Sequence, residues 1–557
     1  MDDSQKISAF EKRIKRQVIG KPRRFLAIAP LGFEQTLVEE LKSIGIESTA
    51  VGDGKVEFTA KIVDAWKAVA YSRIANRVLM HIADFKAENF REFEKKASEI
   101  PWELYLTNNV ILRREATKNP VKQPTPQIAI HVTCKHSRLY HSDAIAERLY
   151  RVIGEALGSP APAVIPAPSH PDAGQDQHSS PERHPDESQD RLLAPERHPD
   201  VGQDRHLATQ NLYINFLDDR CTIWLDLAGE ELYKRGQERY VNDAPLKETI
   251  AAAMLFEILL PIRGSCPLRQ QVAKWSKRLR AAPSAQDDTS IKAQDDTKVA
   301  PSSTAIPSHT PHYTLFDLMA GSGTFSLEAA YKASGLIPGV CRDFALKHQP
   351  AFKEASWNHI LSRRQASSDC VILSAAPSGA QSKNPDKNPE PISRIITSDI
   401  SERAVEIIRH NIECTPLAQN QTRADAEPET KITLDPQQRD IFTYTAAEIA
   451  AACPEGSQPA IVLNPPYGKR LDCDAPELYT QIGRKFTELS RDLKPLGKSL
   501  TVAILAPKDD TRNGAKYTCT SNLLRECPAL DPSHNPKAKK IVTSHGGFSL
   551  NALISAL

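Results

Sequence analysis

Residues 317–330 read Asp-Leu-Met-Ala-Gly-Ser-Gly-Thr-Phe-Ser-Leu-Glu-Ala-Ala, and this stretch decides the fold of the C-terminal half of the chain. Residues 313–317 before the glycines form a short apolar run that ends in an acid, as a buried parallel strand would. Gly321 and Gly323 allow a tight turn and let the backbone approach a ligand without a Cβ clash. The apolar positions from Phe325 onward predict a helix whose amide-rich N-terminus faces this turn.

The Gly-rich turn alone is a weak signal, because a plain strand–helix connection has the same form. A dinucleotide-binding pattern would need a third glycine three residues after Gly323, and that position holds Ser326. No Gly-Lys-Ser/Thr follows, which argues against a nucleoside-triphosphate loop.

Two acids follow the next predicted strands. The apolar run 392–399 ends in Asp399 and precedes a predicted helix over 402–413. An acid at the end of the second strand of a doubly wound sheet can accept hydrogen bonds from ribose hydroxyls, although Asp399 could also simply cap that helix. Asp440 lies where a third strand would end and could accept from an adenine amino group, or it could be a solvated loop acid.

A second motif, Asn464-Pro465-Pro466-Tyr467, follows the apolar strand 460–463. The two prolines stiffen the loop. The Asn464 side-chain oxygen and the Pro465 carbonyl can both accept from one amino group, which orients that nitrogen for reaction. Tyr467 can stack on a base. The alternative is an ordinary proline turn in a surface loop.

Together, in this order, the two motifs predict an enzyme that methylates a planar amino nitrogen with S-adenosylmethionine as cofactor. The catalytic candidates are the four residues 464–467. The cofactor-binding candidates are Asp317, Gly321, Gly323, Thr324, Asp399 and Asp440.

Composition sets the broad class of the protein. The chain has 557 residues, enough for about two to four domains, with 40% hydrophobic and 25% charged residues. A net charge of only +2 means that any nucleic-acid surface is local. No apolar stretch approaches a membrane span and the N-terminus has no signal-peptide core, so we expect a cytoplasmic protein without membrane contact. Ten scattered cysteines without Cys-x-x-Cys spacing predict reduced thiols and no metal.

Three stretches resemble insertions into a compact fold. In residues 170–208 the triplet His-Pro-Asp recurs at 170, 184 and 198, and the surrounding Pro-, Asp- and Gln-rich sequence cannot build a core. Residues 283–311 and 373–391 have a similar character. We expect all three to loop out; binding to a partner protein is the alternative.

The N-terminal half predicts two small α+β units. The first has strands at 24–30 and 55–60 and helices at 32–41 and 62–74. The second has a helix at 143–157 and strands at 128–134, 212–217 and 221–227.

These segments resemble the THUMP-containing RNA guanine-N2 methyltransferases, most of all the bacterial enzyme that methylates 23S ribosomal RNA. The resemblance covers nearly the whole chain apart from the insertions, and the matching segments are 27–34, 101–106, 135–142, 225–236, 244–255 and 464–471. The chain departs from the family at 318–320 and at Ser401, but it keeps both glycines and Asp399.

The resemblance implies an α/β Rossmann-like methyltransferase domain preceded by an α+β ferredoxin-like/THUMP region. The implied domains are a basic N-terminal tail (1–21), a ferredoxin-like domain (22–85), a THUMP domain (86–228, with the repeat insertion at 159–208), a linker helix (229–262) and the methyltransferase domain (245–557). It also implies methyl transfer to the N2 of a guanine in RNA, with 23S ribosomal RNA favoured and transfer RNA possible, by a protein that we expect to be a monomer.

Basic clusters support an RNA partner. They comprise Lys12, Arg13, Lys15, Arg16, Lys21, Arg23 and Arg24, then Lys274, Lys277, Arg278 and Arg280, and finally Lys537, Lys539 and Lys540. Such clusters bind phosphates, or they form a solvated surface. Two further functions stay open, a DNA adenine-N6 methylase and a non-catalytic RNA-binding assembly factor. The THUMP-like half argues against the first, and the intact motifs argue against the second.

Overall fold

The computed structural model describes residues 3–106, 128–158, 210–236, 239–241, 245–259, 312–339, 341–369, 392–415, 417, 434–467, 474–509 and 518–557. The three predicted insertions and the basic cluster at 274–280 lie outside the described residues. None of the helices within these ranges is both long and apolar enough to cross a membrane.

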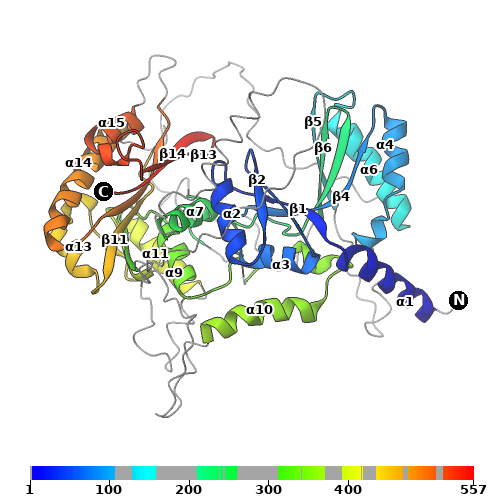
Figure 1. Cartoon of the computed structure of the whole chain (residues 1–557), viewed down its shortest axis with the longest axis horizontal. Coiled ribbons are helices and arrows are strands. Elements are labelled where there is room, and N and C mark those ends of the chain that lie inside the picture. Colours follow the sequence, from blue (N-terminus) through cyan, green and yellow to red (C-terminus); the bar gives the residue numbers. More distant parts are fainter. Residues whose placement is uncertain are drawn as a thin grey trace, which may run out of the picture.

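The N-terminal half forms a seven-stranded sheet in the order β2-β3-β1-β4-β7-β6-β5, coloured blue to green in Figure 1. Its strands are β1 Arg23–Ile28, β2 Ser48–Gly52, β3 Lys55–Ala60, β4 Arg77–Lys86, β5 Ile128–Lys135, β6 Gln210–Leu217 and β7 Arg220–Asp226. Its longer helices are α2 Glu34–Ser43, α3 Ile62–Tyr71, α4 Phe90–Ser98 and α6 Ser142–Leu157. Alternate residues of β1 and β3 point into the core, where Phe25 stacks on Phe58 at 5.2 Å between ring centroids.

The two predicted α+β units are joined in this one sheet. β4 pairs antiparallel with β1 on one side and with β7 on the other. Sequence reasoning did not assign β2 or β4, and β4 is the strand that connects the units. The boundary drawn at residue 85 therefore falls at the end of a strand that belongs to both.

The segment predicted as a basic tail is helical. It contains α1 Asp3–Ile14 and a π-helix at Lys15–Ile19, which Figure 1 shows at the N-terminal end of the molecule. Ile14 and Val18, four residues apart, are buried in the hydrophobic core. The predicted basic tail therefore also contributes two apolar residues to the core.

The C-terminal half forms a second seven-stranded sheet in the order β10-β9-β8-β11-β12-β14-β13. Its strands are β8 His312–Asp317, β9 Ile392–Asp399, β10 Gln437–Gln438, β11 Ser457–Leu463, β12 Thr501–Pro507, β13 Lys539–His545 and β14 Phe548–Ala556. The helices are α7 Glu248–Leu259, α9 Thr324–Ala333, α10 Glu354–Asp369, α11 Glu402–Glu413, α13 Ala446–Ala452, α14 Ala475–Leu493 and α15 Cys519–Glu526. The structure thus has the predicted α/β architecture after an α+β region.

The direction of the strand order reverses between β8 and β11. β8 pairs in parallel with both β9 and β11, and β11 pairs in parallel with β12, so their carboxyl ends meet at one edge. β14 runs antiparallel to β12, which brings its first residue to the same edge. In open α/β sheets this reversal point, at the carboxyl ends of the strands, is where ligands bind.

The linker predicted as a helix over 229–262 is helical only from Glu248 onward. Residues 229–236 form turns instead, and Gly236 has a φ of 78° with the Arg342 side chain directly against it. Only glycine adopts this conformation easily, and it bends the chain between the two halves.

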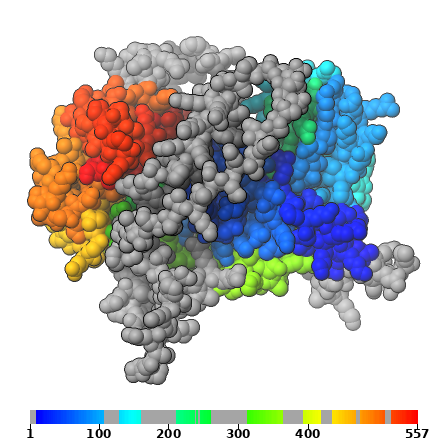
Figure 2. All heavy atoms as spheres, in the orientation of Figure 1, coloured from blue at the N-terminus to red at the C-terminus, as the bar shows by residue number. Residues whose placement is uncertain are grey.

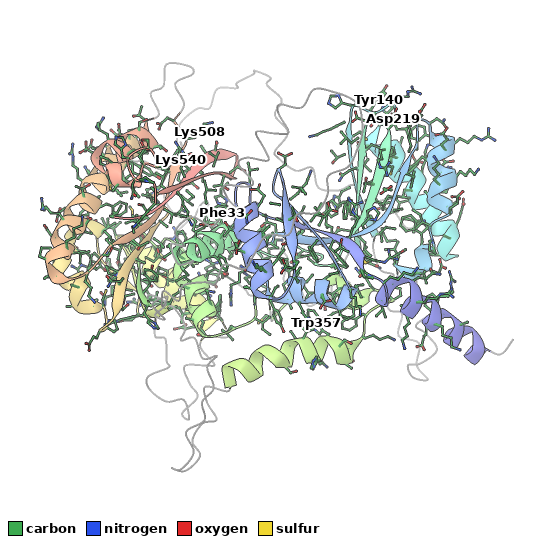
Figure 3. The ribbon with its side chains drawn as sticks, viewed as in Figure 1. Phe33, Tyr140, Asp219, Trp357, Lys508 and Lys540 are labelled. Atoms are coloured by element: carbon green, nitrogen blue, oxygen red, sulfur yellow. The ribbon has the colours of Figure 1, made fainter. Side chains whose placement is uncertain are left out.

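The ferredoxin-like part is packed tightly against the C-terminal half. Gly32, in the turn after β1, lies so close to the Val542 carbonyl of β13 that a Cβ would meet it at 2.2 Å. Phe33, fully buried beside it, lies near the middle of the molecule in Figure 3. Figure 2 shows the two halves at opposite ends of the molecule.

Candidate functional site

The Gly-rich turn between β8 and α9 adopts the conformation that its glycines allow. Gly321 and Gly323 have φ angles of 55° and 78°, which side chains of L-residues rarely tolerate. A Cβ at Gly323 would press on Ile408 at 3.1 Å, whereas a Cβ at Gly321 would meet nothing within 4 Å. Gly323 thus permits close packing against α11, and Gly321 borders open space. Thr324 begins α9, and Gly323 is its N-cap.

Asp317 lies beneath this turn. It is 1% exposed, and its Oδ2 accepts hydrogen bonds from the backbone N and the hydroxyl of Ser326 at 3.1 and 2.7 Å. Burial raises the pKa of Asp317 to about 7, the Ser326 hydrogen bonds oppose this shift, and the charge of Asp399 adds to it. Oδ1 is buried and accepts no hydrogen bond from the described residues. Asp317 therefore holds the start of α9 through Ser326, while its Oδ1 atom has no donor among the described residues.

Asp399 links the Gly-rich turn to β9. Its Oδ2 accepts from the Gly321 amide at 2.8 Å, and its Oδ1 accepts from the Ser401 amide at 2.9 Å. The N-cap of α11 is Ser401, whose side chain accepts from the Ala404 amide. The alternative hypothesis, that Asp399 caps this helix, is therefore wrong. Ile400 beside it is 65% exposed and offers an apolar surface at the same edge.

Asp440 lies two residues beyond the end of the neighbouring strand, β10. β10 pairs with β9 through Gln438 and Asp399, and the Arg439 amide donates to the Asp399 carbonyl at 2.9 Å. Asp440 itself caps a short 3-10 helix by accepting from the Phe442 amide at 3.0 Å. Asp440 thus lies two residues beyond Gln438, the residue that pairs with Asp399, so both predicted acids lie near the same edge of the sheet.

The Asn-Pro-Pro-Tyr loop begins at the same edge. Val462 of β11 pairs with Asp317 of β8, so Asn464 lies just beyond the end of the strand beside the Gly-rich turn. The Asn464 Oδ1 atom is buried and accepts no hydrogen bond from the described residues. A buried amide oxygen without a donor is costly, so this atom is available for a donor that a ligand supplies.

Tyr467, at the end of this loop, is partly buried and contacts Phe548. The two rings meet edge to face with 5.8 Å between centroids and 70° between planes. Phe548 is the first residue of β14 and is 42% exposed. Tyr467 and Phe548 thus place two aromatic rings in contact where the loop after β11 meets the start of β14. Sequence reasoning missed Phe548 because its position depends on the antiparallel pairing of β14.

Two further residues outside the motifs contact the Gly-rich turn. Arg239 donates to the Thr324 hydroxyl at 3.0 Å, and Asn411 of α11 donates to the Ser322 carbonyl at 3.2 Å. Sequence reasoning missed Arg239 and Asn411 because each contacts a turn that is more than 80 residues away in the sequence. The site therefore combines a turn that is held by hydrogen bonds from several elements with two buried oxygens, Asp317 Oδ1 and Asn464 Oδ1, that have no donor among the described residues.

Comparison with family models matches two parts of the chain. Residues 24–79 match the RlmL ferredoxin-like domain, and residues 304–508 match the RMKL-like methyltransferase domain. The first match lies in the N-terminal sheet, and the second covers much of the C-terminal α/β half. The second match covers the Gly-rich turn, Asp399 and the Asn-Pro-Pro-Tyr loop.

Among curated proteins, the chain is similar to the ribosomal RNA large subunit methyltransferase K/L of Allochromatium vinosum. The two are 24% identical over 469 residues, which is 83% of this chain and 45% of that protein. It is also similar to the putative RNA methyltransferase YpsC of Bacillus subtilis, at 23% identity, covering 84% of this chain and 86% of YpsC. The chain thus spans about half the length of the K/L relatives and most of YpsC.

Solved structures show the same fold. SMU.472, a putative methyltransferase complexed with SAH, matches with a TM-score of 0.55 at 18% identity, covering 96% of this chain and 98% of that one. A predicted N6-adenine-specific DNA methylase from Listeria monocytogenes matches equally well, covering 96% of both chains at 18% identity with a TM-score of 0.55. The order of the N-terminal and methyltransferase parts is therefore shared along nearly the whole chain.

Proposed function

We propose that this protein transfers a methyl group from S-adenosylmethionine to the exocyclic N2 of a guanine in RNA, with 23S ribosomal RNA as the favoured substrate. The buried Oδ1 of Asn464, which accepts no hydrogen bond from the described residues, carries the proposal, because it lies at the reversal point of the sheet and can accept from an amino group. The similarity to ribosomal RNA methyltransferases K/L supports RNA as the substrate class.

The residues around the Gly-rich turn suit the proposed cofactor. When bound, S-adenosylmethionine supplies an electrophilic methyl group. Asp399 would accept from the ribose hydroxyls, Ile400 would cover one face of the adenine, and Asp440 would accept from its amino group. Gly321 leaves space for close approach, and the first amides of α9 face that space.

The reacting amino group would be held by the Asn-Pro-Pro-Tyr loop. Asn464 Oδ1 and the Pro465 carbonyl accept its two N–H groups, which directs the nitrogen lone pair toward the methyl group. The rigid prolines keep these acceptors in place without a conformational cost at the moment of reaction. The proton leaves after the methyl group has arrived, so the chain needs no general base.

RNA would reach this site over surfaces that both halves provide. Lys12, Lys15, Arg16 and Lys21 are exposed, and within the described residues they make no ion pair, whereas Arg13, Arg23 and Arg24 have partners inside the protein. Figure 3 shows Tyr140, which is 66% exposed, at the upper end of the N-terminal sheet. Lys508 and Lys540 lie on the same upper side of the C-terminal half. Exposed cations bind phosphates, and an exposed tyrosine can stack on an unpaired base.

Nucleoside mass spectrometry of fractionated RNA from cells with and without this gene tests the proposed function. We expect N2-methylguanine to be lost from the large ribosomal RNA of the deletion strain. Loss from transfer RNA would select the transfer RNA alternative, and loss of N6-methyladenine from DNA would select a DNA adenine methylase. An unchanged set of modified nucleosides would favour the non-catalytic assembly factor.

Asp399→Ala should weaken binding of S-adenosylmethionine. The loss of hydrogen bonds to a charged group costs about 1.5–3 kcal/mol, or about 10- to 150-fold in Kd. The variant also frees the amides of Gly321 and Ser401, so Asp399→Asn, which keeps an acceptor for one of them, should lose less. Titration calorimetry checks this, and unchanged affinity in Asp399→Ala would remove Asp399 from the cofactor site.

Tyr467→Ala should reduce methylation much more than Tyr467→Phe, because the proposed contribution is the ring and not the hydroxyl. Stacking on one base contributes about 1–3 kcal/mol. Phe548→Ala removes the ring that contacts Tyr467 edge to face, so it should lower RNA methylation while leaving cofactor affinity unchanged. Equal losses in the two Tyr467 variants would instead give the hydroxyl a role.

A further inference from the structure

Arg239, in the linker between the two halves, contacts the Gly-rich turn at residues next to the one that Asp399 holds. Arg239 donates from Nη2 to the Thr324 hydroxyl at 3.0 Å and to the carbonyl and hydroxyl of Ser322 at 3.3 and 3.4 Å. Its Nη1 forms an ion pair with Glu248 of α7, and the side chain is only 11% exposed. A planar guanidinium can hold several acceptors in fixed directions at once. Arg239 thus fixes the turn and the start of α9 to a helix outside them.

Tyr240, the residue that follows Arg239, is bonded to Asn411 of α11, and Asn411 in turn contacts the Gly-rich turn. The Tyr240 amide donates to Asn411 Oδ1 at 2.8 Å, and Asn411 Nδ2 donates to the Tyr240 carbonyl at 2.9 Å and to the Ser322 carbonyl at 3.2 Å. Tyr240 also stacks on His410, with 3.8 Å between ring centroids. Asn411 is fully buried, so these bonds are shielded from water.

The same linker is fixed to the ferredoxin-like part a few residues earlier. Arg235 donates to both carboxylate oxygens of Glu328 on α9, at 2.9 and 3.1 Å, and to the Arg73 carbonyl at 2.8 Å. All these side chains are at most 7% exposed. The linker therefore cannot shift without breaking buried, charge-assisted hydrogen bonds.

We propose that Arg239 is a positioning residue for cofactor binding, which holds the Gly-rich turn in its binding conformation through Ser322 and Thr324. This rests on the proposed use of S-adenosylmethionine. A turn with positive φ angles at two glycines is intrinsically flexible, and ordering it when the ligand binds costs affinity. Asp399 restrains the turn through Gly321, and Arg239 restrains it through the next residues, so the turn is ordered before the cofactor arrives.

The residues that support cofactor binding would then extend beyond the predicted methyltransferase domain. Arg239 precedes residue 245, where sequence reasoning began the methyltransferase domain, and follows the last strand of the N-terminal sheet, β7. Its loss should act on cofactor affinity, seen as a higher KM for S-adenosylmethionine, and should leave kcat at saturating cofactor close to the wild-type value. A purely structural role would not separate the two constants in this way.

Calorimetric titration of S-adenosylmethionine into the full-length protein tests the proposal with Arg239→Met and Arg239→Lys. Arg239→Met keeps the length of the side chain without its donors, and we expect a Kd about 10- to 30-fold above wild type. Arg239→Lys keeps the positive charge beside Glu248 and should recover part of the loss.

Arg77→Met is the matched control, because Arg77 is also partly buried and bonded to a carboxylate and a carbonyl, namely Asp226 at 2.7 Å and Gly229 at 2.8 Å, away from the turn. It should lower the thermal transition without changing the Kd by more than about threefold.

A Kd within about threefold of wild type in Arg239→Met would overturn the proposal, as would an equal loss in Arg77→Met. Should Arg239→Met fail to fold, Arg239→Lys decides: a wild-type Kd and KM in that variant would also overturn it. Absence of cofactor binding in the wild-type protein is a different result, since it would refute the proposed function itself.

Discussion

Asn464→Ala is expected to lower kcat for RNA methylation by about 10²–10³-fold, the usual effect of removing one preorganised polar group from a reacting centre. The nitrogen gains positive charge as the methyl group arrives, so the acceptor is used most strongly in the transition state. Cofactor affinity should hardly change, because Asn464 lies beyond β11 while the proposed cofactor contacts lie around β8 and β9. Single-turnover methylation assays with saturating cofactor measure the effect.

Asn464→Asp provides the matched control. A carboxylate of nearly the same size still accepts from an amino group, so this variant should retain far more activity than Asn464→Ala. Methylation by Asn464→Ala at the wild-type rate would refute the proposed role of Asn464 in holding the amino group. A loss confined to cofactor binding would move Asn464 from the amino group to the cofactor.

The elements around the proposed site could be predicted from sequence because their signals are local. The structure places β9 at Ile392–Asp399 and α11 at Glu402–Glu413, which are the predicted bounds. In these segments a run of apolar residues ends in an acid, and a helical period with its own N-cap follows. Gly321 and Gly323 also take the positive φ angles that their residue type suggests.

Other features could not be predicted because they depend on contacts distant in sequence. Phe548 reaches the site only because β14 reverses direction beside β12, and Arg239 meets Thr324 across 85 residues. Several predicted RNA-binding cations have intramolecular partners: Arg24 pairs with Glu57, and Lys539 forms an ion pair with Glu257. A cluster of charges in the sequence does not show which of its members a fold will neutralise.

No sequence pattern predicts the buried ion pairs between the two halves. Glu328 on α9 is 1% exposed and interacts with two arginines, Arg235 at 2.9 Å and Arg73 at 3.5 Å. Burial on its own would lower the pKa of Arg235, but the charge and hydrogen bonds of Glu328 outweigh it and the pKa is raised. Two buried guanidinium groups therefore share Glu328 as a counter-charge.

Glu328→Gln should consequently be the most destabilising of the substitutions considered. It leaves two buried guanidinium groups without a counter-charge, and breaking a buried ion pair from one side costs about 3–5 kcal/mol of unfolding free energy. Urea denaturation of the full-length variant measures this cost. Glu230→Gln, at an ion pair with Lys234 that is largely exposed, should barely change the transition. Replacing Glu328 and Arg235 together by methionine should recover part of the loss, because the double variant buries less unpaired charge than Glu328→Gln. If Glu328→Gln were as stable as the wild type, the ion pairs of Glu328 would contribute little to the contact between the two halves.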